Sequence, residues 1–198
     1  QRRNAHCYLL LSWARRPSHV LRRGAEKVYN PAMFTESLSE SLSSPPIVGR
    51  VVGIAVKTVR RGPMRPIDEA KAVVDGGITV DLRPSRKRGI TLLSREQWDE
   101  ATAELGVDLP WLTRRANVLV EGLRMGELIG RRVRLGTVEL LIRGETTPCK
   151  MMDEQHPGLR EALAPDCRAG VYGQVLRAGR FRVGDPVEPL PEVEADAP

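Results

Sequence analysis

From residue 47 onward, short apolar runs alternate with glycine, proline and charged positions. The pattern predicts strands over 47–56, 77–84, 88–94, 116–122, 131–136, 137–144, 169–179 and 180–188. In 131–136, RRVRLG, arginine alternates with apolar side chains, which is typical of a strand with one wet and one buried face. The 18 Gly and 15 Pro also favour many short strands over a helical bundle. We therefore expect a mainly β fold with short helices, closed into a β-barrel-like domain.

Two helices are predicted among these strands, one between Ser94 and Gly106 and one over 156–163. Ser94 and Gln97 have the spacing of a capping box, and Gly106 supplies a C-terminal stop. Trp98 lies on the apolar face of the first helix. We expect that face to pack on the sheet.

The positive charge of the chain is concentrated at its start. Residues 1–32 carry six Arg, one Lys and one Glu, which equals the net charge of +6 for the whole sequence. Residues 33–198 hold 24 basic and 24 acidic residues. The composition therefore predicts a basic, flexible extension over 1–45 outside the fold, one domain over 46–190, and a disordered acidic tail over 191–198.

Composition also excludes several classes of protein. A neutral globular part does not concentrate a polyanion, so we expect no nucleic-acid partner. No stretch approaches the roughly 18 apolar residues of a membrane span, and three cysteines without framework spacing argue against a disulfide-stapled secreted domain. The prediction is a cytoplasmic protein with no membrane partner.

Cysteine chemistry is the main functional signal. The segment RGETTPCKMMDE, 143–154, places Cys149 at the end of an apolar strand, between Pro148 and Lys150. The spacing alone leaves two interpretations open, a buried structural thiol and a reactive thiolate that carries sulfur or binds a metal. Cys167 is interpreted as a buried thiol in a loop near the last strands.

Four segments taken together resemble one known family. RGITLLS, RRANVLVEG, ELIGRRVRLGTVELLIRGETTPCKMM and AGVYGQVLRAGRFRVGDPV follow one another in the order found in the MOSC domain. This module is named for the C-terminal part of molybdenum-cofactor sulfurases, and the resemblance covers residues 46–188. It implies a β-rich barrel that handles sulfur or a pterin-bound molybdenum centre.

The resemblance also implies roles for particular residues. Cys149 would carry a persulfide or, as in the related amidoxime reductases, ligate molybdenum. Arg115 and Asn117 occupy the family's Arg-x-Asn motif, with Ala116 in place of the proline common in relatives. The implied cofactor is the molybdenum cofactor, molybdopterin. Pyridoxal phosphate would act only through a partner desulfurase, because the desulfurase domain of full-length sulfurases does not occur in this sequence.

The predicted site comprises five positions besides Cys149. Arg88, Arg115 and Arg168 are the arginines expected around a phosphate-bearing ligand, because the guanidinium fork matches phosphate oxygens. Each of them is also compatible with a solvated charge at a strand end. Lys150 is adjacent to the thiol, and positive charge nearby stabilises a thiolate. Asn117 would donate to a pterin or phosphate, or close a turn.

Three functions follow from the resemblance. In the first, Cys149 receives sulfur from a cysteine desulfurase and passes it to a molybdoenzyme partner, which is sulfurtransferase-like chemistry. In the second, Cys149 is a molybdenum ligand in an oxidoreductase that reduces N-hydroxylated compounds with electrons from a donor protein. The third is a non-catalytic module that delivers the cofactor.

The charge distribution generates the first testable prediction. Residues 33–198, expressed without the basic segment, should bind duplex DNA no better than a neutral control protein at physiological salt, because they carry no net charge. Fluorescence anisotropy with a labelled duplex measures this. Tight binding that weakens steeply with added salt would contradict the prediction.

Overall fold

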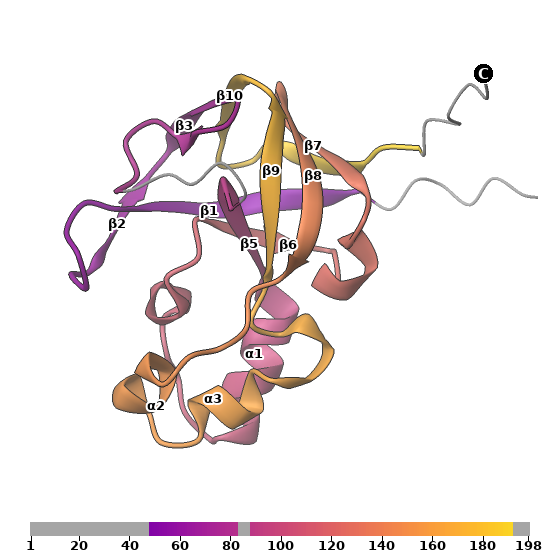
Figure 1. Ribbon diagram of the computed structural model, residues 1–198. Helices are drawn as coiled ribbons and strands as arrows, with labels where there is room; N and C mark the ends of the chain where they lie inside the picture. The colour runs from indigo at the N-terminus through magenta and orange to yellow at the C-terminus, as the bar shows by residue number, and fades with distance from the viewer. Residues whose placement is uncertain (1–47, 83–87, 192–198) are drawn as a thin grey trace, which may run out of the picture. The chain divides into compact units, whose positions relative to one another are not determined.

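The computed structural model describes residues 48–82 and 88–191 (Figure 1). The predicted extension over 1–45 lies outside the described residues, as do residues 192–198 of the predicted tail. The strands are β1 (Gly49–Lys57), β2 (Met64–Ile67), β3 (Glu69–Val73), β4 (Gly77–Ile78), β5 (Ile90–Ser94), β6 (Val118–Glu121), β7 (Arg132–Leu135), β8 (Val138–Glu145), β9 (Val171–Arg177), β10 (Gly179–Arg182) and β11 (Pro186–Pro189). The helices are α1 (Arg95–Glu104), α2 (Met151–Gln155) and α3 (Leu159–Ala162), with 3₁₀ turns η2 (Trp111–Arg114), η3 (Met125–Leu128) and η4 (Pro165–Cys167).

Seven strands close into a barrel in the order β1-β11-β7-β8-β9-β5-β6, with β6 pairing back onto β1. Six of these seven pairings are antiparallel, and β5 with β6 is the parallel one. Strand β2 extends the sheet beside β1, and β10, β3 and β4 form a second, three-stranded sheet. The expected mainly β, barrel-like fold is confirmed.

Two hydrophobic clusters hold the fold together. The first fills the barrel with aliphatic side chains such as Ile54, Leu92 and Leu140, each at most 1% exposed. The second lies where α1, α2 and α3 gather beyond one end of the barrel (Figure 1), and it includes Trp98 of α1 and Met152 of α2. The apolar face predicted for α1 is therefore buried as expected.

The N-terminus of α1 differs from the expected capping box in one respect. The Ser94 hydroxyl accepts a hydrogen bond from the backbone N–H of Gln97 at 3.4 Å, as predicted. The buried Gln97 side chain instead donates to the Asp166 carbonyl at 2.7 Å and accepts from the Met125 N–H at 2.9 Å. Gln97 thus joins three segments of the chain, and Gly106, at φ +66°, follows the end of the helix as predicted.

Several predicted boundaries were wrong. The strand expected over 77–84 is only two residues long, because the chain turns at Asp81. Strands β2 and β3 were missed, since MRPI and EAKAV are only four and five residues long and each contains a single β-branched residue. The helix expected over 156–163 is present as α3 but begins only at Leu159, after Gly158 with φ +84°, and the separate helix α2 precedes it.

Gly170, at the start of β9, gives a prediction for stability. It has φ +92°, and a Cβ there would lie 2.3 Å from the Leu92 carbonyl oxygen. Gly170→Ala should therefore cost about 3 kcal/mol of unfolding free energy, from the left-handed backbone and the backbone collision. Urea denaturation measures the difference.

Gly130 is the matched control. It has a similar φ of +83°, but nothing lies within 4 Å of the added Cβ. Gly130→Ala should lower the unfolding free energy by only about 1–2 kcal/mol, the cost of an alanine in a left-handed backbone. Equal losses for the two variants would show that the contact with Leu92 is relieved without cost.

Candidate functional site

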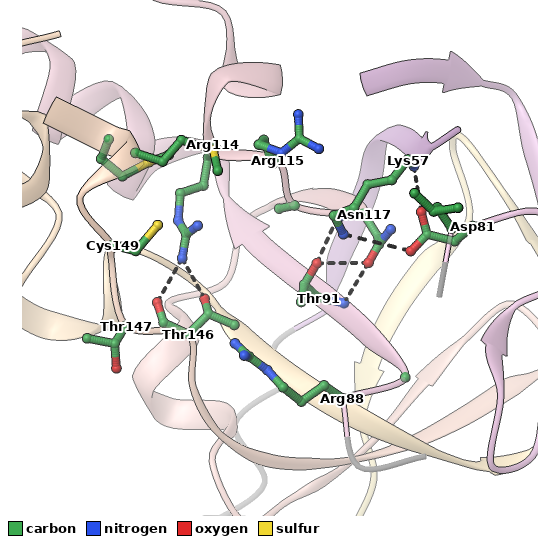
Figure 2. A pocket seen from close by; sticks show the side chains of 15 residues that line it. Lys57, Asp81, Arg88, Thr91, Arg114, Arg115, Asn117, Thr146, Thr147 and Cys149 are labelled. Atoms are coloured by element: carbon green, nitrogen blue, oxygen red, sulfur yellow. Dashed lines mark hydrogen bonds and ion pairs between the residues drawn. The ribbon is translucent and has the colours of Figure 1, made fainter. Parts of the chain in front are cut away.

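A cavity of about 440 Å³ opens at one end of the barrel (Figure 2). Its walls come from the end of β1, from β5, from the turn between η2 and β6, from the segment after β8, and from α2. The lining residues are Lys57, Asp81, Leu82, Arg88, Gly89, Thr91, Arg114, Arg115, Ala116, Asn117, Thr146, Thr147, Cys149, Met151 and Met152. The volume falls within the range of small-molecule sites.

Four of the predicted site residues meet in this cavity: Cys149, Arg88, Arg115 and Asn117. They come from three places in the sequence, and the barrel brings them together. The Cys149 side chain is exposed, so the interpretation as a buried structural thiol is wrong. Lys150 is exposed too, and it occupies the N-cap position of α2 beside the cavity.

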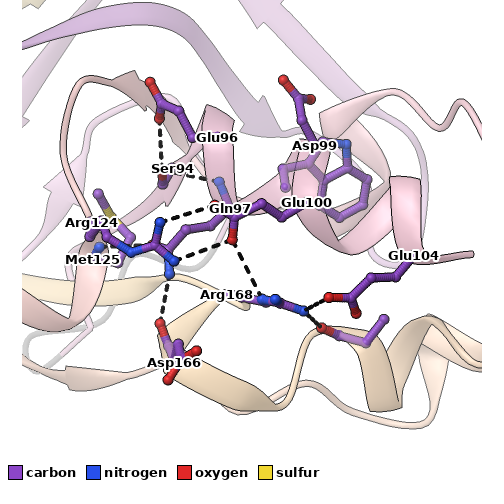
Figure 3. A network of polar contacts seen from close by, with 12 residues as sticks. Ser94, Glu96, Gln97, Asp99, Glu100, Glu104, Arg124, Met125, Asp166 and Arg168 are labelled. Atoms are coloured by element: carbon purple, nitrogen blue, oxygen red, sulfur yellow. Dashed lines mark hydrogen bonds and ion pairs between the residues drawn. The ribbon is translucent and has the colours of Figure 1, made fainter.

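Arg168, which was predicted to bind the ligand, lies outside the cavity. Its guanidinium faces α1, where it pairs with Glu104 at 2.8 Å and with Glu100 at 3.8 Å (Figure 3). It also donates to the Ala162 carbonyl at 3.3 Å. These contacts tie η4 to α1 and α3, so the structure gives Arg168 a packing role.

Arg114, which was not predicted as a site residue, is firmly held in the wall of the cavity. Its Nε donates to the Ala169 carbonyl at 2.7 Å, and its Nη2 donates to the carbonyl and the hydroxyl of Thr146 at 2.8 and 3.0 Å (Figure 2). Burial lowers the pKa of Arg114 to about 10, while the negative charge of Cys149 acts in the opposite direction. Arg114 therefore stays protonated at neutral pH, close to the thiol.

Arg115 reaches a different wall of the cavity. It ends η2 with a left-handed backbone, φ +64°, which turns its side chain away from that of Arg114. Its Nη1 donates to the Gly62 carbonyl in the turn between β1 and β2. Arg115 therefore lines the cavity as predicted, while the arginine whose charge interacts with Cys149 in Figure 2 is Arg114.

Asn117 is a structural junction at the base of the cavity. It is buried, and its Oδ1 accepts from the backbone N–H and the hydroxyl of Thr91 at 3.2 and 2.9 Å. Its Nδ2 donates to the Ala55 carbonyl at 3.3 Å. These bonds join β5, β1 and the residue before β6. Whether Asn117 also donates to a ligand stays a prediction.

Lys57 and Asp81 form a polar pair in the wall away from the thiol (Figure 2). Their charged atoms, Nζ and Oδ2, lie 3.7 Å apart, and the Lys57 N–H donates to Asp81 Oδ1 at 2.5 Å. Burial lowers the pKa of Lys57, and Asp81 partly opposes that effect. Neither residue was predicted, because a lysine at the end of a strand cannot be recognised as a site residue from the sequence.

The cavity is electropositive. Among the described residues that line it, Lys57, Arg88, Arg114 and Arg115 face one carboxylate, Asp81. The Arg88 guanidinium stacks 5.1 Å from the centroid of the Tyr172 ring. Such a cavity attracts anions, and arginines in particular suit phosphate, sulfate or persulfide groups.

The donor set limits how a metal would bind. No group of three or more His, Cys, Asp or Glu side chains comes together within 48–82 and 88–191. A metal bound in this cavity would therefore bring most of its ligands with it. One exposed thiol beside several guanidiniums fits a metal centre on an anionic organic cofactor.

Across residues 48–82 and 88–191, no helix is long and apolar enough to span a bilayer.

Comparison with known families places this fold. The family model for the MOSC domain matches residues 79–188, more than half of the chain, so the protein belongs to the MOSC domain family. A search of curated proteins gave no match.

Solved structures are similar in fold. The YUAD protein from Bacillus subtilis is 22% identical with a TM-score of 0.63, over 73% of this chain and 96% of that chain. YiiM from Geobacillus stearothermophilus is 17% identical with a TM-score of 0.60, over 72% and 75% of the two chains. YiiM from Escherichia coli is 16% identical with a TM-score of 0.57, over 74% and 72%. At these identities the likeness shows the barrel fold.

Thr146 gives a prediction for the stability of the site. It is buried, its hydroxyl donates to the Ala169 carbonyl at 2.6 Å, and it accepts from Arg114. Thr146→Val keeps the shape but removes both bonds, so it should lower the unfolding free energy by about 1–3 kcal/mol in urea denaturation.

Thr147 is the neighbouring control, because its side chain is exposed. Thr147→Val should change the unfolding free energy by less than about 0.5 kcal/mol. A loss at Thr147 as large as that at Thr146 would contradict the importance of the buried hydroxyl.

Proposed function

We propose that this MOSC-domain protein is a sulfur carrier for molybdenum-cofactor chemistry, and that Cys149 holds the sulfur as a persulfide. One observation carries the proposal: the thiol is exposed at the edge of an electropositive cavity. A persulfide is an anion at neutral pH, and the reacting sulfur must be reached by both a donor and an acceptor. An exposed thiol beside fixed guanidiniums meets both requirements.

The loading step is a transfer of sulfane sulfur. The Cys149 thiolate attacks the outer sulfur of a persulfide on the donor, a partner cysteine desulfurase. A new S–S bond forms at Cys149 as the donor's S–S bond breaks and the donor leaves as its thiolate. The proton of the transferred SH group passes to that thiolate, so the donor ends as a thiol and Cys149 as an anionic persulfide. The transfer needs no added oxidant, because the outer sulfur keeps its oxidation state. Pyridoxal phosphate belongs to the desulfurase.

Residues of the cavity would hold the charged partners of this chemistry. The positive charge of Arg114 interacts with the charge of the Cys149 thiolate. Arg88 and Arg115 would hold the phosphate of a molybdenum cofactor. When bound, that cofactor supplies a redox-active metal centre that accepts sulfur. A molybdoenzyme that carries it is the expected acceptor partner, and the cytoplasm is the expected compartment.

A second candidate function is favoured by the size of the cavity. A volume of about 440 Å³ admits a small organic substrate or part of a cofactor. The protein would then be a molybdenum-dependent reductase of N-hydroxylated compounds, with Cys149 as metal ligand and a separate electron donor. Molybdenum analysis of protein from its native host separates the two functions, because only the reductase requires one metal per chain.

Cysteine labelling and sulfur loading test the proposed carrier. Cys149 is exposed, whereas Cys167 is half-buried and burial raises its pKa, so iodoacetamide should label Cys149 first at neutral pH. Incubation with a cysteine desulfurase and cysteine should then add one sulfur, seen by mass spectrometry and reversed by a reductant.

Two serine variants complete the test. Cys149→Ser should abolish the sulfur adduct and leave the unfolding free energy almost unchanged, because the side chain is exposed. Cys167→Ser is the matched control and should load like the wild type. A protein in which Cys149 stays inert while Cys167 takes up the label or the sulfur would contradict the assignment.

A further inference from the structure

The guanidinium of Arg114 joins the two segments that border the reactive thiol. Its Nε bonds to the Ala169 carbonyl, at the start of β9, and its Nη2 bonds to the carbonyl and hydroxyl of Thr146. Thr146 stands three positions before Cys149, and its own hydroxyl also donates to the Ala169 carbonyl. The guanidinium and the threonine thus form a closed set of hydrogen bonds beneath the thiol (Figure 2).

The Ala169 carbonyl, which accepts hydrogen bonds from both Arg114 and Thr146, is held in place by the residues that precede it. Asp166 and Cys167 both have left-handed backbones, with φ of +52° and +56°, which direct the chain from η4 towards β9. The Asp166 carbonyl is fixed by the buried Gln97 of α1 (Figure 3). The Cys167 carbonyl accepts from the Gly170 N–H at 2.8 Å. The position of the Ala169 carbonyl is therefore fixed by the packing of α1, and Arg114 bonds to a rigid acceptor.

Arg114 differs in this respect from the other arginines of the cavity. The charge of Arg115 is directed to the turn at Gly62, and that of Arg88 lies over Tyr172. Figure 2 shows the Arg114 side chain next to Cys149, and the charges of the two groups interact. Because Arg114 is partly buried, the field of its guanidinium is less screened by water than that of an exposed side chain.

We infer that Arg114 is a positioning residue with two effects on Cys149. Its hydrogen bonds hold the segment that carries the thiol, and its charge makes the thiol selective for reactants with a negative charge next to the reacting atom. The inference rests on the proposed function and deepens it. The compounds that give sulfur to this protein or receive sulfur from it should be anionic sulfur compounds, or proteins that present an anionic sulfur group in the cavity.

Two alkylating reagents of similar size measure this selectivity. Iodoacetate is an anion and iodoacetamide is neutral, and both react with the thiolate. The ratio of their rates at Cys149 is therefore independent of the fraction of thiolate and reports the local potential. Rates are read by peptide mass spectrometry on the full chain, at one pH and low salt.

Three variants give the expected pattern. Arg114→Gln removes the charge and should lower the ratio of iodoacetate to iodoacetamide rates about fivefold to tenfold. Arg114→Lys keeps the charge and should stay within about twofold of the wild type. Arg143→Gln is the matched control, since Arg143 is an exposed arginine of β8 that bonds to Gln174, and its ratio should equal that of the wild type.

The outcomes separate this inference from the proposed function. A protein that loads sulfur on Cys149 but shows equal ratios in the wild type and Arg114→Gln refutes the role of Arg114 and leaves the carrier function intact. A ratio that falls in Arg114→Gln supports the role of Arg114, even if no sulfur is loaded and the carrier function fails. If Arg114→Gln does not unfold cooperatively, comparison with glutathione as a free-thiol reference decides. A ratio that is well above that of glutathione in both the wild type and Arg114→Lys supports the inference, and a ratio equal to that of glutathione overturns it.

Discussion

The parallel pairing of β5 with β6 is the constraint on which the site depends. Two parallel neighbours cannot be joined by a tight turn, so the chain must leave the barrel and return to the end from which β6 begins. The crossover, residues 95–117, contains α1 and η2. Helix α1, in the first part of the crossover, packs into the second hydrophobic cluster. The last residues of the crossover place Arg114, Arg115 and Asn117 at the rim of the barrel.

The other wall of the site comes from the opposite side of the same sheet. Strand β9 pairs antiparallel with both β5 and β8, and Val171 at its start lies opposite both Leu92 of β5 and Glu145 at the end of β8. The chain after β8 carries Thr146 and Cys149 across this rim, and Arg114 connects it to Ala169. The thiol is thus held by hydrogen bonds between segments that the barrel topology brings together, although the Cys149 side chain itself is exposed.

The sequence was enough to predict the elements with strong apolar patterns and the position of the thiol. The alternation in RRVRLG and the Ser94 cap correspond to β7 and α1, and the order of four motifs identified the family. Which of two adjacent arginines lies beside Cys149 was beyond prediction, because a left-handed backbone at Arg115 decides it. Arg168 was misplaced for a similar reason. Its partners are acidic residues of α1 far away in the sequence, and only the packing of η4 reveals them.

The charge balance of the cavity also emerges only on folding. Residues 33–198 are formally neutral, yet the described lining of the cavity has four cations and one carboxylate. Acidic side chains instead form ion pairs outside the cavity, as Glu100 and Glu104 do with Arg168. A chain without net charge can therefore present a local site for a small anion while having no general affinity for polyanions.

The most direct test is the state of Cys149 in protein taken from its native host. Cells are treated with an alkylating reagent before lysis, and the peptides that contain Cys149 and Cys167 are mapped by mass spectrometry beside a molybdenum measurement. A sulfur carrier predicts a capped persulfide at Cys149, none at Cys167, and far less than one molybdenum per chain. A plain thiol at Cys149 together with one molybdenum per chain would contradict it.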